Sequence, residues 1–375
     1  MTAPAAPREY KLISADGHLN GPGDIWTTRV SQKYLDQVPK VERRPEGDAW
    51  VCEGFEARGF GWEACAGRAP DQQGEWCRYE DIHPGGYDPK ARVEEQIADG
   101  VDAELLFPMG FASGYVKGTK DPDFHYEMVR AYNDFLSEFC SHAPDRLVGA
   151  AMIPSRGVDQ ALAEIKRCQD LPGLGAWLLQ SYPNGTTRIS DADEPVWSLV
   201  EETGKPLTIH IGLTDRPPSA KRMSVRGLPG TGHFYDAPSR MLEWAFSGVL
   251  DRHQSLRIIL AEVDCGWMPY FAEQADDNYL RHAFADLKDS RLRLLPSEYM
   301  SEFFFPTFIT DHYAIDNRHR ANLVNRMMWS NDYPHITSDW PYSWKTINAS
   351  FAGVPADERH AILAGNAQRL LGLGA

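Results

Sequence analysis

Eight short apolar runs, separated by segments with helical spacing, restrict the fold of this sequence more than any other feature. Each run is almost continuous in hydrophobic residues, which is typical of parallel strands buried on both faces. The runs cover residues 10–15, 101–107, 147–153, 176–179, 206–211, 256–261, 303–309 and 327–330. The helical patterns cover residues 90–99, 123–142, 158–168, 191–203, 239–252, 268–284, 313–324 and 356–371. This alternation predicts a closed (β/α)8 TIM barrel of the α/β class.

The alternative architecture is an open, doubly wound parallel sheet. That fold carries a glycine-rich phosphate-binding turn after its first strand, and no such turn follows residues 10–15. We therefore expect residues 1–375 to form one TIM-barrel domain. Residues 20–90 are rich in Gly, Pro, Trp and charge, and we interpret them as a loop-rich insertion or cap after the first strand. Residues 213–237 form a second long loop, after the fifth strand.

Composition excludes several classes of function. The net charge is −15, so binding to nucleic acid is not expected. No apolar run reaches the roughly 18 residues that are needed to cross a bilayer, and the amino-terminal segment lacks the layout of a signal peptide. The six cysteines form no CxxC pair and are interpreted as reduced thiols. These features predict a cytoplasmic protein that acts on a small molecule.

Polar residues at the carboxyl ends of the predicted strands indicate where chemistry takes place. Asp16 and His18 follow the first run, His210 and Glu262 lie at the ends of the fifth and sixth, and Asp332 follows the eighth. TIM barrels build their active sites at this end of the barrel. Asp16 and His18 are two residues apart, so both side chains point to the same face of an extended segment. Mixed imidazole and carboxylate ligands favour Zn²⁺, Mn²⁺ or Fe²⁺ over Ca²⁺.

Several segments together resemble the amidohydrolase-related family, the branch of the amidohydrolase superfamily that contains aminocarboxymuconate-semialdehyde decarboxylase and the dihydroxybenzoate decarboxylases. The resemblance extends over nearly the whole chain and implies a metal-dependent TIM barrel. The segments that carry it are SADGHLNGPGDIW (14–26), PLTIHIG (206–212), ILAEVDCGWMPYF (259–271), PSEY (296–299), MWSNDYPH (328–335) and the tail ILAGNAQRLLGL.

The resemblance also implies roles for individual residues. Asp16 and His18 match the paired ligands of the first strand, His210 matches the ligand of the fifth strand, and Asp332 matches the strand-eight aspartate that binds metal and orients water or substrate. Glu262 stands where the decarboxylases place a catalytic His. Two further differences are Gly21, where close relatives carry Glu, and the absence of a lysine at 177–181 that could bridge two metals as a carbamate.

Further residues are candidates for the same site. His335 could contact Asp332 or the substrate, and His312 could be an additional metal ligand, as could His233. Glu262 could bridge two metals instead of transferring a proton. We therefore expect one divalent ion, Zn, Mn or Fe, or two such ions.

Three functions remain open on the sequence. The leading hypothesis is hydrolysis or nonoxidative decarboxylation of a small to medium organic acid, ester or amide through metal-activated water, with Glu262 as acid or base and Asp332 and His335 as catalytic partners. The alternative is a nonheme diiron monooxygenase that hydroxylates a bulky apolar, terpenoid-like substrate. The third is a noncatalytic metal-binding barrel. The resemblance also implies a homo-oligomer.

Overall fold

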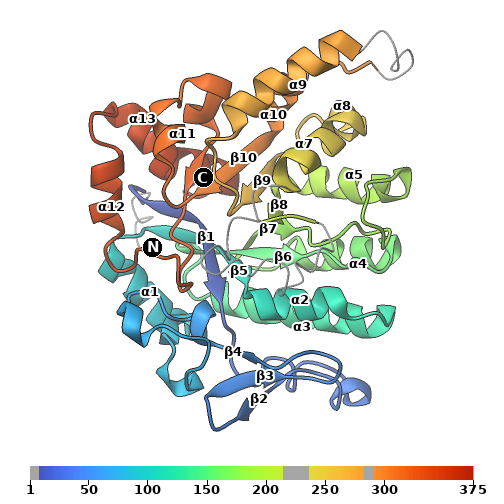
Figure 1. Ribbon diagram of the computed structural model, residues 1–375. Helices are drawn as coiled ribbons and strands as arrows, with labels where there is room; N and C mark the ends of the chain where they lie inside the picture. Colours follow the sequence, from blue (N-terminus) through green and yellow to red (C-terminus); the bar gives the residue numbers. More distant parts are fainter. Residues whose placement is uncertain (1–7, 214–235, 283–290, 375) are drawn as a thin grey trace, which may run out of the picture.

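In the part of the chain that the structure describes, a sheet of eight parallel strands forms the centre of the protein. The computed structural model describes residues 8–213, 236–282 and 291–374. The strands follow one another in chain order around the sheet (Figure 1). They are β1 (Ile13–Leu19), β5 (Ala103–Pro108), β6 (Leu147–Met152), β7 (Leu174–Leu178), β8 (Leu207–His210), β9 (Ile258–Ala261), β10 (Phe304–Phe308) and β11 (Met328–Trp329). The small strands of the insertion form a separate sheet.

The first and last strands meet and close the sheet into a barrel. The backbone N–H of His18 donates to the carbonyl of Tyr333 at 2.7 Å, and that of Asp332 donates to the carbonyl of Asp16 at 3.0 Å. A parallel bridge joins Gly17 to Tyr333. The predicted (β/α)8 barrel is thus confirmed, and the few hydrogen bonds of this seam hold together two segments that carry candidate ligands.

Each predicted apolar run overlaps an observed strand. The largest difference is at β1, which starts at Ile13 and continues through Asp16 and His18 to Leu19. The apolar pattern predicts an end at residue 15, four residues before the observed one, because polar side chains in the second half of the strand point into the mouth of the barrel. The strand is buried along its whole length in spite of them.

Helices surround the barrel (Figure 1). They are α1 (Pro89–Asp99), α2 (Gly110–Gly118), α3 (Pro122–Cys140), α4 (Val158–Cys168), α5 (Glu194–Thr203), α7 (Asp236–Phe246), α8 (Val249–Arg252), α9 (Met268–His282), α10 (Pro296–Phe303), α11 (His312–Asp316), α12 (Ser343–Ser350), α13 (Ala356–His360) and α14 (Asn366–Leu371). All eight regions that the sequence predicts as helices contain helix. The pattern did not predict α2, α10 and α12.

Three of the predicted helices are interrupted. The region 239–252 is divided between α7 and α8 at Gly248, which has a φ of 74°. The region 313–324 contains α11 and then a 3-10 segment, Arg320–Asn325. The region 356–371 contains a π-helical turn, Ala361–Gly365, between α13 and α14. Glycine disrupts the first helix because its left-handed backbone ends the regular hydrogen-bond ladder.

The segment between β1 and α1 forms a small sheet beside the barrel mouth. Its antiparallel strands are β2 (Lys40–Arg43), β3 (Asp48–Val51) and β4 (Arg58–Gly59), in the order β2-β3-β4. Trp50 of β3 stacks on Phe111 of α2 with ring centroids 5.9 Å apart. This contact places the small sheet over α2. The division of the chain into one domain with a cap stays a prediction.

The described helices include none that is long and apolar enough to cross a membrane. Cytoplasmic location and oligomeric state stay predictions.

Candidate metal centre and active site

Strand β1 presents Asp16 and His18 to the interior of the barrel mouth. Alternation along the strand points both side chains the same way, and both are almost completely buried. Asp16 Oδ1 lies 3.3 Å from His18 Nε2. Gly17 stands between them, and a Cβ atom there would lie 2.7 Å from Nη2 of Arg92. A side chain at this position would displace the guanidinium group of Arg92, which packs against the strand.

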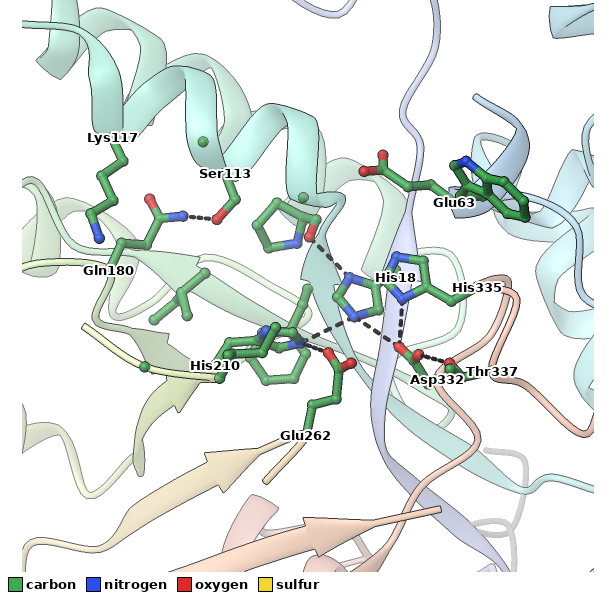
Figure 2. A pocket seen from close by; sticks show the side chains of 18 of the residues that line it. His18, Glu63, Ser113, Lys117, Gln180, His210, Glu262, Asp332, His335 and Thr337 are labelled. Carbon is green, nitrogen blue, oxygen red and sulfur yellow. Dashed lines mark hydrogen bonds and ion pairs between the residues drawn. The ribbon is translucent and has the colours of Figure 1, made fainter. Parts of the chain in front are cut away.

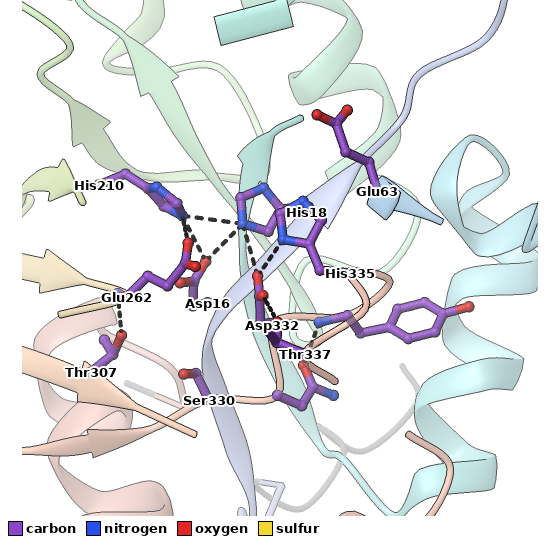
Figure 3. A network of polar contacts seen from close by, with 12 residues as sticks. Asp16, His18, Glu63, His210, Glu262, Thr307, Ser330, Asp332, His335 and Thr337 are labelled. Carbon is purple, nitrogen blue, oxygen red and sulfur yellow. Dashed lines mark hydrogen bonds and ion pairs between the residues drawn. The ribbon is translucent and has the colours of Figure 1, made fainter. Parts of the chain in front are cut away.

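The neighbouring strands β8 and β9 bring His210 and Glu262 to the same point (Figure 3). His210 Nε2 lies 3.1 Å from His18 Nε2, 3.4 Å from Asp16 Oδ1 and 3.6 Å from Glu262 Oε2. Glu262 follows β9 with a φ of 58°. Non-glycine residues seldom adopt this backbone, and they do so mainly where the surrounding structure enforces a functional orientation.

Asp332 reaches the cluster from the loop after β11, also with a positive φ of 51°. Its Oδ1 lies 3.2 Å from His18 Nε2 and 2.7 Å from His335 Nδ1. The hydroxyl of Thr337 donates to Asp332 Oδ2. These contacts hold the carboxylate of Asp332 in one orientation.

The residues of this cluster fit a divalent metal ion. One group of potential ligand atoms comes from Asp16, His18, His210 and Glu262, and a second comes from His18, Asp332 and His335; within each group the atoms lie within 4.8 Å of one another. Both carboxylate oxygens of Asp16 are buried without a hydrogen-bond partner. A buried charge of this kind is costly unless it is paired or coordinates a metal.

The orientation of His18 supports the same interpretation. Its Nδ1 lies 3.0 Å from the carbonyl oxygen of Pro108, which can only accept a hydrogen bond. Nδ1 therefore carries a proton, and in the neutral ring the lone pair is on Nε2, which faces Asp16, His210 and Asp332. Metal-binding histidines are commonly held in this way by a backbone carbonyl. Because only Nε2 is available, His18 can ligate a single ion.

The pKa values of both His18 and Glu262 are raised, by different balances of burial and neighbouring carboxylates. For His18, burial lowers the pKa, but the nearby carboxylates of Asp16 and Asp332 outweigh it and the pKa is raised. For Glu262, burial and the negative charges of Asp332 and Asp16 together raise the pKa well above its ordinary value. A positive ion at the centre would oppose this effect, since it favours ionised carboxylates.

A cavity of about 730 Å³ opens beside the cluster (Figure 2). His18, His210, Glu262 and Asp332 line its inner end. The insertion contributes Arg58, Trp62 and Glu63 to the wall, and α2 contributes Gly110, Ser113, Gly114 and Lys117. The volume falls in the range of roughly 300–1,000 Å³ that is typical of small-molecule sites.

The structure brings together six of the seven candidate residues that lie in the described part of the chain. Asp16, His18, His210, Glu262, Asp332 and His335 belong to the two groups. His312 does not, and it is exposed at the first position of α11. The side chain of the preceding residue, Asp311, caps that helix and accepts hydrogen bonds from the backbone of Cys265 and Gly266, so the chain turns away from the cluster. His233 lies outside the described residues.

Sequence reasoning missed the cavity residues that do not follow a predicted strand. Arg58 and Glu63 form an ion pair of 2.8 Å in the insertion. Ser113 and Lys117 lie on α2, which was not predicted as a helix. Thr337 acts on Asp332 through a hydroxyl five positions later in the chain, and a Thr in a loop gives no signal of such a role.

Comparison with known proteins identifies the family. The sequence profile described as amidohydrolase matches residues 68–373, which is most of the chain. The chain belongs to the amidohydrolase family. This confirms the resemblance drawn from the motifs.

Two curated relatives and one solved structure illustrate the similarity. The 2-amino-3-carboxymuconate-6-semialdehyde decarboxylase of Dictyostelium discoideum is 23% identical over 301 residues, which cover 79% of each chain. The gamma-resorcylate decarboxylase of Rhizobium sp. (strain MTP-10005) is 27% identical over 319 residues, which cover 75% of this chain and 86% of the relative. A dihydroxybenzoic acid decarboxylase from Polaromonas sp. JS666, solved with manganese and 2-nitroresorcinol, has a TM-score of 0.64 and 19% identity over 98% of both chains.

The hydroxyl of Thr337 gives a first testable prediction. Thr337→Val removes the donor to Asp332 Oδ2 and keeps the size of the side chain. Loss of such a supporting hydrogen bond typically weakens metal binding by about 10–100-fold. Titration of the metal-free protein with Mn²⁺ measures the effect, and Thr337→Ser, which retains the hydroxyl, is expected to bind as the wild type does. Equal affinities of all three proteins would show that the contact is dispensable.

Proposed function

We propose that this amidohydrolase-family chain is a metal-dependent carboxy-lyase that releases CO₂ from a small to medium organic acid without an oxidant. The observation that carries the proposal is the convergence of Asp16, His18, His210 and Glu262 at the inner end of a cavity, with Asp332 held beside His18. The curated relatives named above are both decarboxylases, and the related structure was solved with manganese. These names favour decarboxylation over the hydrolytic and oxygenase readings.

The metal would be held by Asp16, His18, His210 and Asp332. When bound, a divalent cation supplies positive charge that attracts the carboxylate and neighbouring oxygen of the substrate and stabilises negative charge in the transition state. His335 and Thr337 would keep Asp332 oriented through their hydrogen bonds. The buried Asp16 would act as an anionic ligand that never contacts the substrate.

Glu262 would carry the proton that the reaction consumes. Its side chain is 23% exposed, whereas those of Asp16 and Asp332 are 0% and 1% exposed, so it is the carboxyl group of the cluster that can best contact a substrate. It would protonate the carbon that bears the carboxylate. The carbon–carbon bond to the carboxylate then breaks and CO₂ leaves. The electron pair of that bond stays with the product and restores its conjugated π system. The Glu262 carboxylate regains a proton from solvent.

The test is removal and replacement of the metal. The protein is stripped with a chelator and then assayed with Mn²⁺, Zn²⁺ or Fe²⁺ against a panel of hydroxylated aromatic acids, with release of CO₂ as the readout. We expect no turnover after stripping and recovery with one equivalent of metal per chain, because both groups of potential ligands share His18, which offers only Nε2. Amide, ester and lactone substrates are assayed in parallel.

Three results would contradict the proposal. Hydrolysis of an amide or ester without release of CO₂ would favour the hydrolase. Two irons per chain together with consumption of O₂ would favour the oxygenase. Turnover that persists after complete metal removal would exclude a metal-dependent reaction of either kind.

A further inference from the structure

Helix α2 builds one wall of the cavity from a single face. Gly110, Ser113, Gly114 and Lys117 line the cavity, and their spacing of three or four residues places them one above another on the helix. At a rise of about 1.5 Å per residue, this face is about 10 Å long from Gly110 to Lys117. The cavity therefore continues well beyond the metal ligands.

The glycines of this face keep the cavity wide. A Cβ atom added to Gly114 would meet no other atom within 4 Å, so the space in front of it is open. A Cβ atom added to Gly110 would lie 3.1 Å from Glu63 Oε1, so the cavity is narrower at Gly110 than at Gly114. The room along α2 exceeds what a single-ring acid held at the metal would fill.

Polar groups occupy the far end of this face. Figure 2 shows Ser113, Lys117 and Gln180 together, on the opposite side of the cavity from Asp332 and His335. Gln180 follows β7, is 9% exposed, and donates a hydrogen bond from its amide to the hydroxyl oxygen of Ser113. The hydroxyl of Ser113 accepts from Gln180 and therefore keeps its own hydrogen to donate. Lys117 adds a positive charge one helical turn further on.

We propose that Ser113, Lys117 and Gln180 form a second binding subsite, which receives an anionic group at the far end of an elongated acid. This rests on the proposed function, because the reacting carboxylate is taken to lie at the metal. A hydroxyl hydrogen and an ammonium group beside each other are suitable donors for a carboxylate, and hydrogen bonds that involve charged groups are the stronger class. The substrate class is then an elongated acid with polar groups at both ends.

Binding of three probes to the manganese-loaded protein tests the subsite. The probes are salicylate, a biphenyl analogue of salicylate, and the same biphenyl with a carboxylate at the far position of its outer ring. Dissociation constants are measured by calorimetry. We expect the carboxylated biphenyl to bind at least tenfold more tightly than the plain biphenyl, which corresponds to one charge-assisted hydrogen bond.

Two variants locate the effect. In Lys117→Met the advantage of the carboxylated biphenyl over the plain one is expected to disappear. Gly114→Leu fills the open space, and it is expected to weaken both biphenyl probes at least tenfold more than it weakens salicylate. Lys120→Met, an exposed lysine just beyond α2, is the matched control and is expected to preserve all three affinities.

Distinct results separate this proposal from the proposed function. If the two biphenyls bind the wild type equally, or if neither binds, or if Lys117→Met weakens both to the same degree, the subsite is refuted. These measurements do not depend on turnover. Failure of the protein to release CO₂ from any acid would contradict the proposed function, while a binding preference that depends on Lys117 would still support the subsite.

Discussion

Glu262→Gln is expected to lower kcat for CO₂ release by about 10²–10⁴-fold, the usual contribution of a positioned proton donor. The amide has nearly the same shape as the carboxyl group but cannot deliver a proton. Asp16, His18, His210 and Asp332 remain in place, so metal content after loading is expected to stay near that of the wild type. Elemental analysis and single-turnover rates measure the two quantities separately.

The control is Glu273→Gln on α9, an exposed glutamate for which we expect wild-type rates. Two outcomes would remove Glu262 from the proton-transfer role. Full activity of Glu262→Gln would show that another group supplies the proton. Loss of metal together with loss of activity would make Glu262 primarily a ligand, as its distance of 3.6 Å from His210 Nε2 allows.

Arg92→Met is expected to destabilise the protein by about 3–5 kcal/mol, the typical effect of removing one partner from a buried ion pair. The Arg92 side chain is completely buried, and its Nε lies 2.6 Å from Oε2 of Glu104, which is also buried. Methionine is close in volume but leaves the carboxylate of Glu104 without its charged partner. Urea unfolding followed by circular dichroism measures the change.

Arg92 also joins the two segments of the barrel seam. Its Nη1 donates to the carbonyl of His18 at 2.9 Å, and its Nη2 donates to the carbonyl of Tyr333 at 3.3 Å. We therefore expect weaker Mn²⁺ binding by Arg92→Met, because the segments that carry His18 and Asp332 lose a common support.

Two further variants test this explanation of the Arg92→Met effect. Arg92→Met combined with Glu104→Met removes both charges and is expected to recover part of the stability. Arg281→Met, from an exposed pair with Asp277, is expected to leave the unfolding midpoint unchanged. A stable Arg92→Met protein with normal Mn²⁺ affinity would contradict the role of Arg92 at the seam.

The pattern of apolar residues was sufficient to predict the barrel. Strands buried on both faces require nearly continuous hydrophobic runs, and the runs at 147–153 and 256–261 correspond to β6 and β9 within two residues at each end. The candidate ligands could be predicted for a related reason. Parallel strands in a barrel end on the same side, so polar residues at the ends of distant runs, such as His18 and His210, must face one opening.

Helix α2 shows what such a pattern cannot predict. Its sequence, GFASGYVKG, contains three glycines, and no side chain caps its first turn. Glycine disfavours helices, so local propensity gives no reason for one here. Tertiary contacts supply the stability: Phe111 stacks on Trp50, and Tyr115 donates to the carbonyl of Gln37. The cavity wall that α2 forms therefore depends on tertiary contacts, which local propensity does not predict.

His312 and His335, which follow strands β10 and β11, differ in position for the same reason: tertiary contacts place each loop. His335 contacts Asp332, and His312 points away because Asp311 caps a helix and binds the backbone after β9. The residue types and their positions after a strand are alike in the sequence. Which of the two joins the cluster depends on how each loop packs after its strand ends, because side chains beyond a strand are directed by the hydrogen bonds of the loop and not by strand alternation. Alternation was enough for Asp16 and His18, which lie within β1 itself.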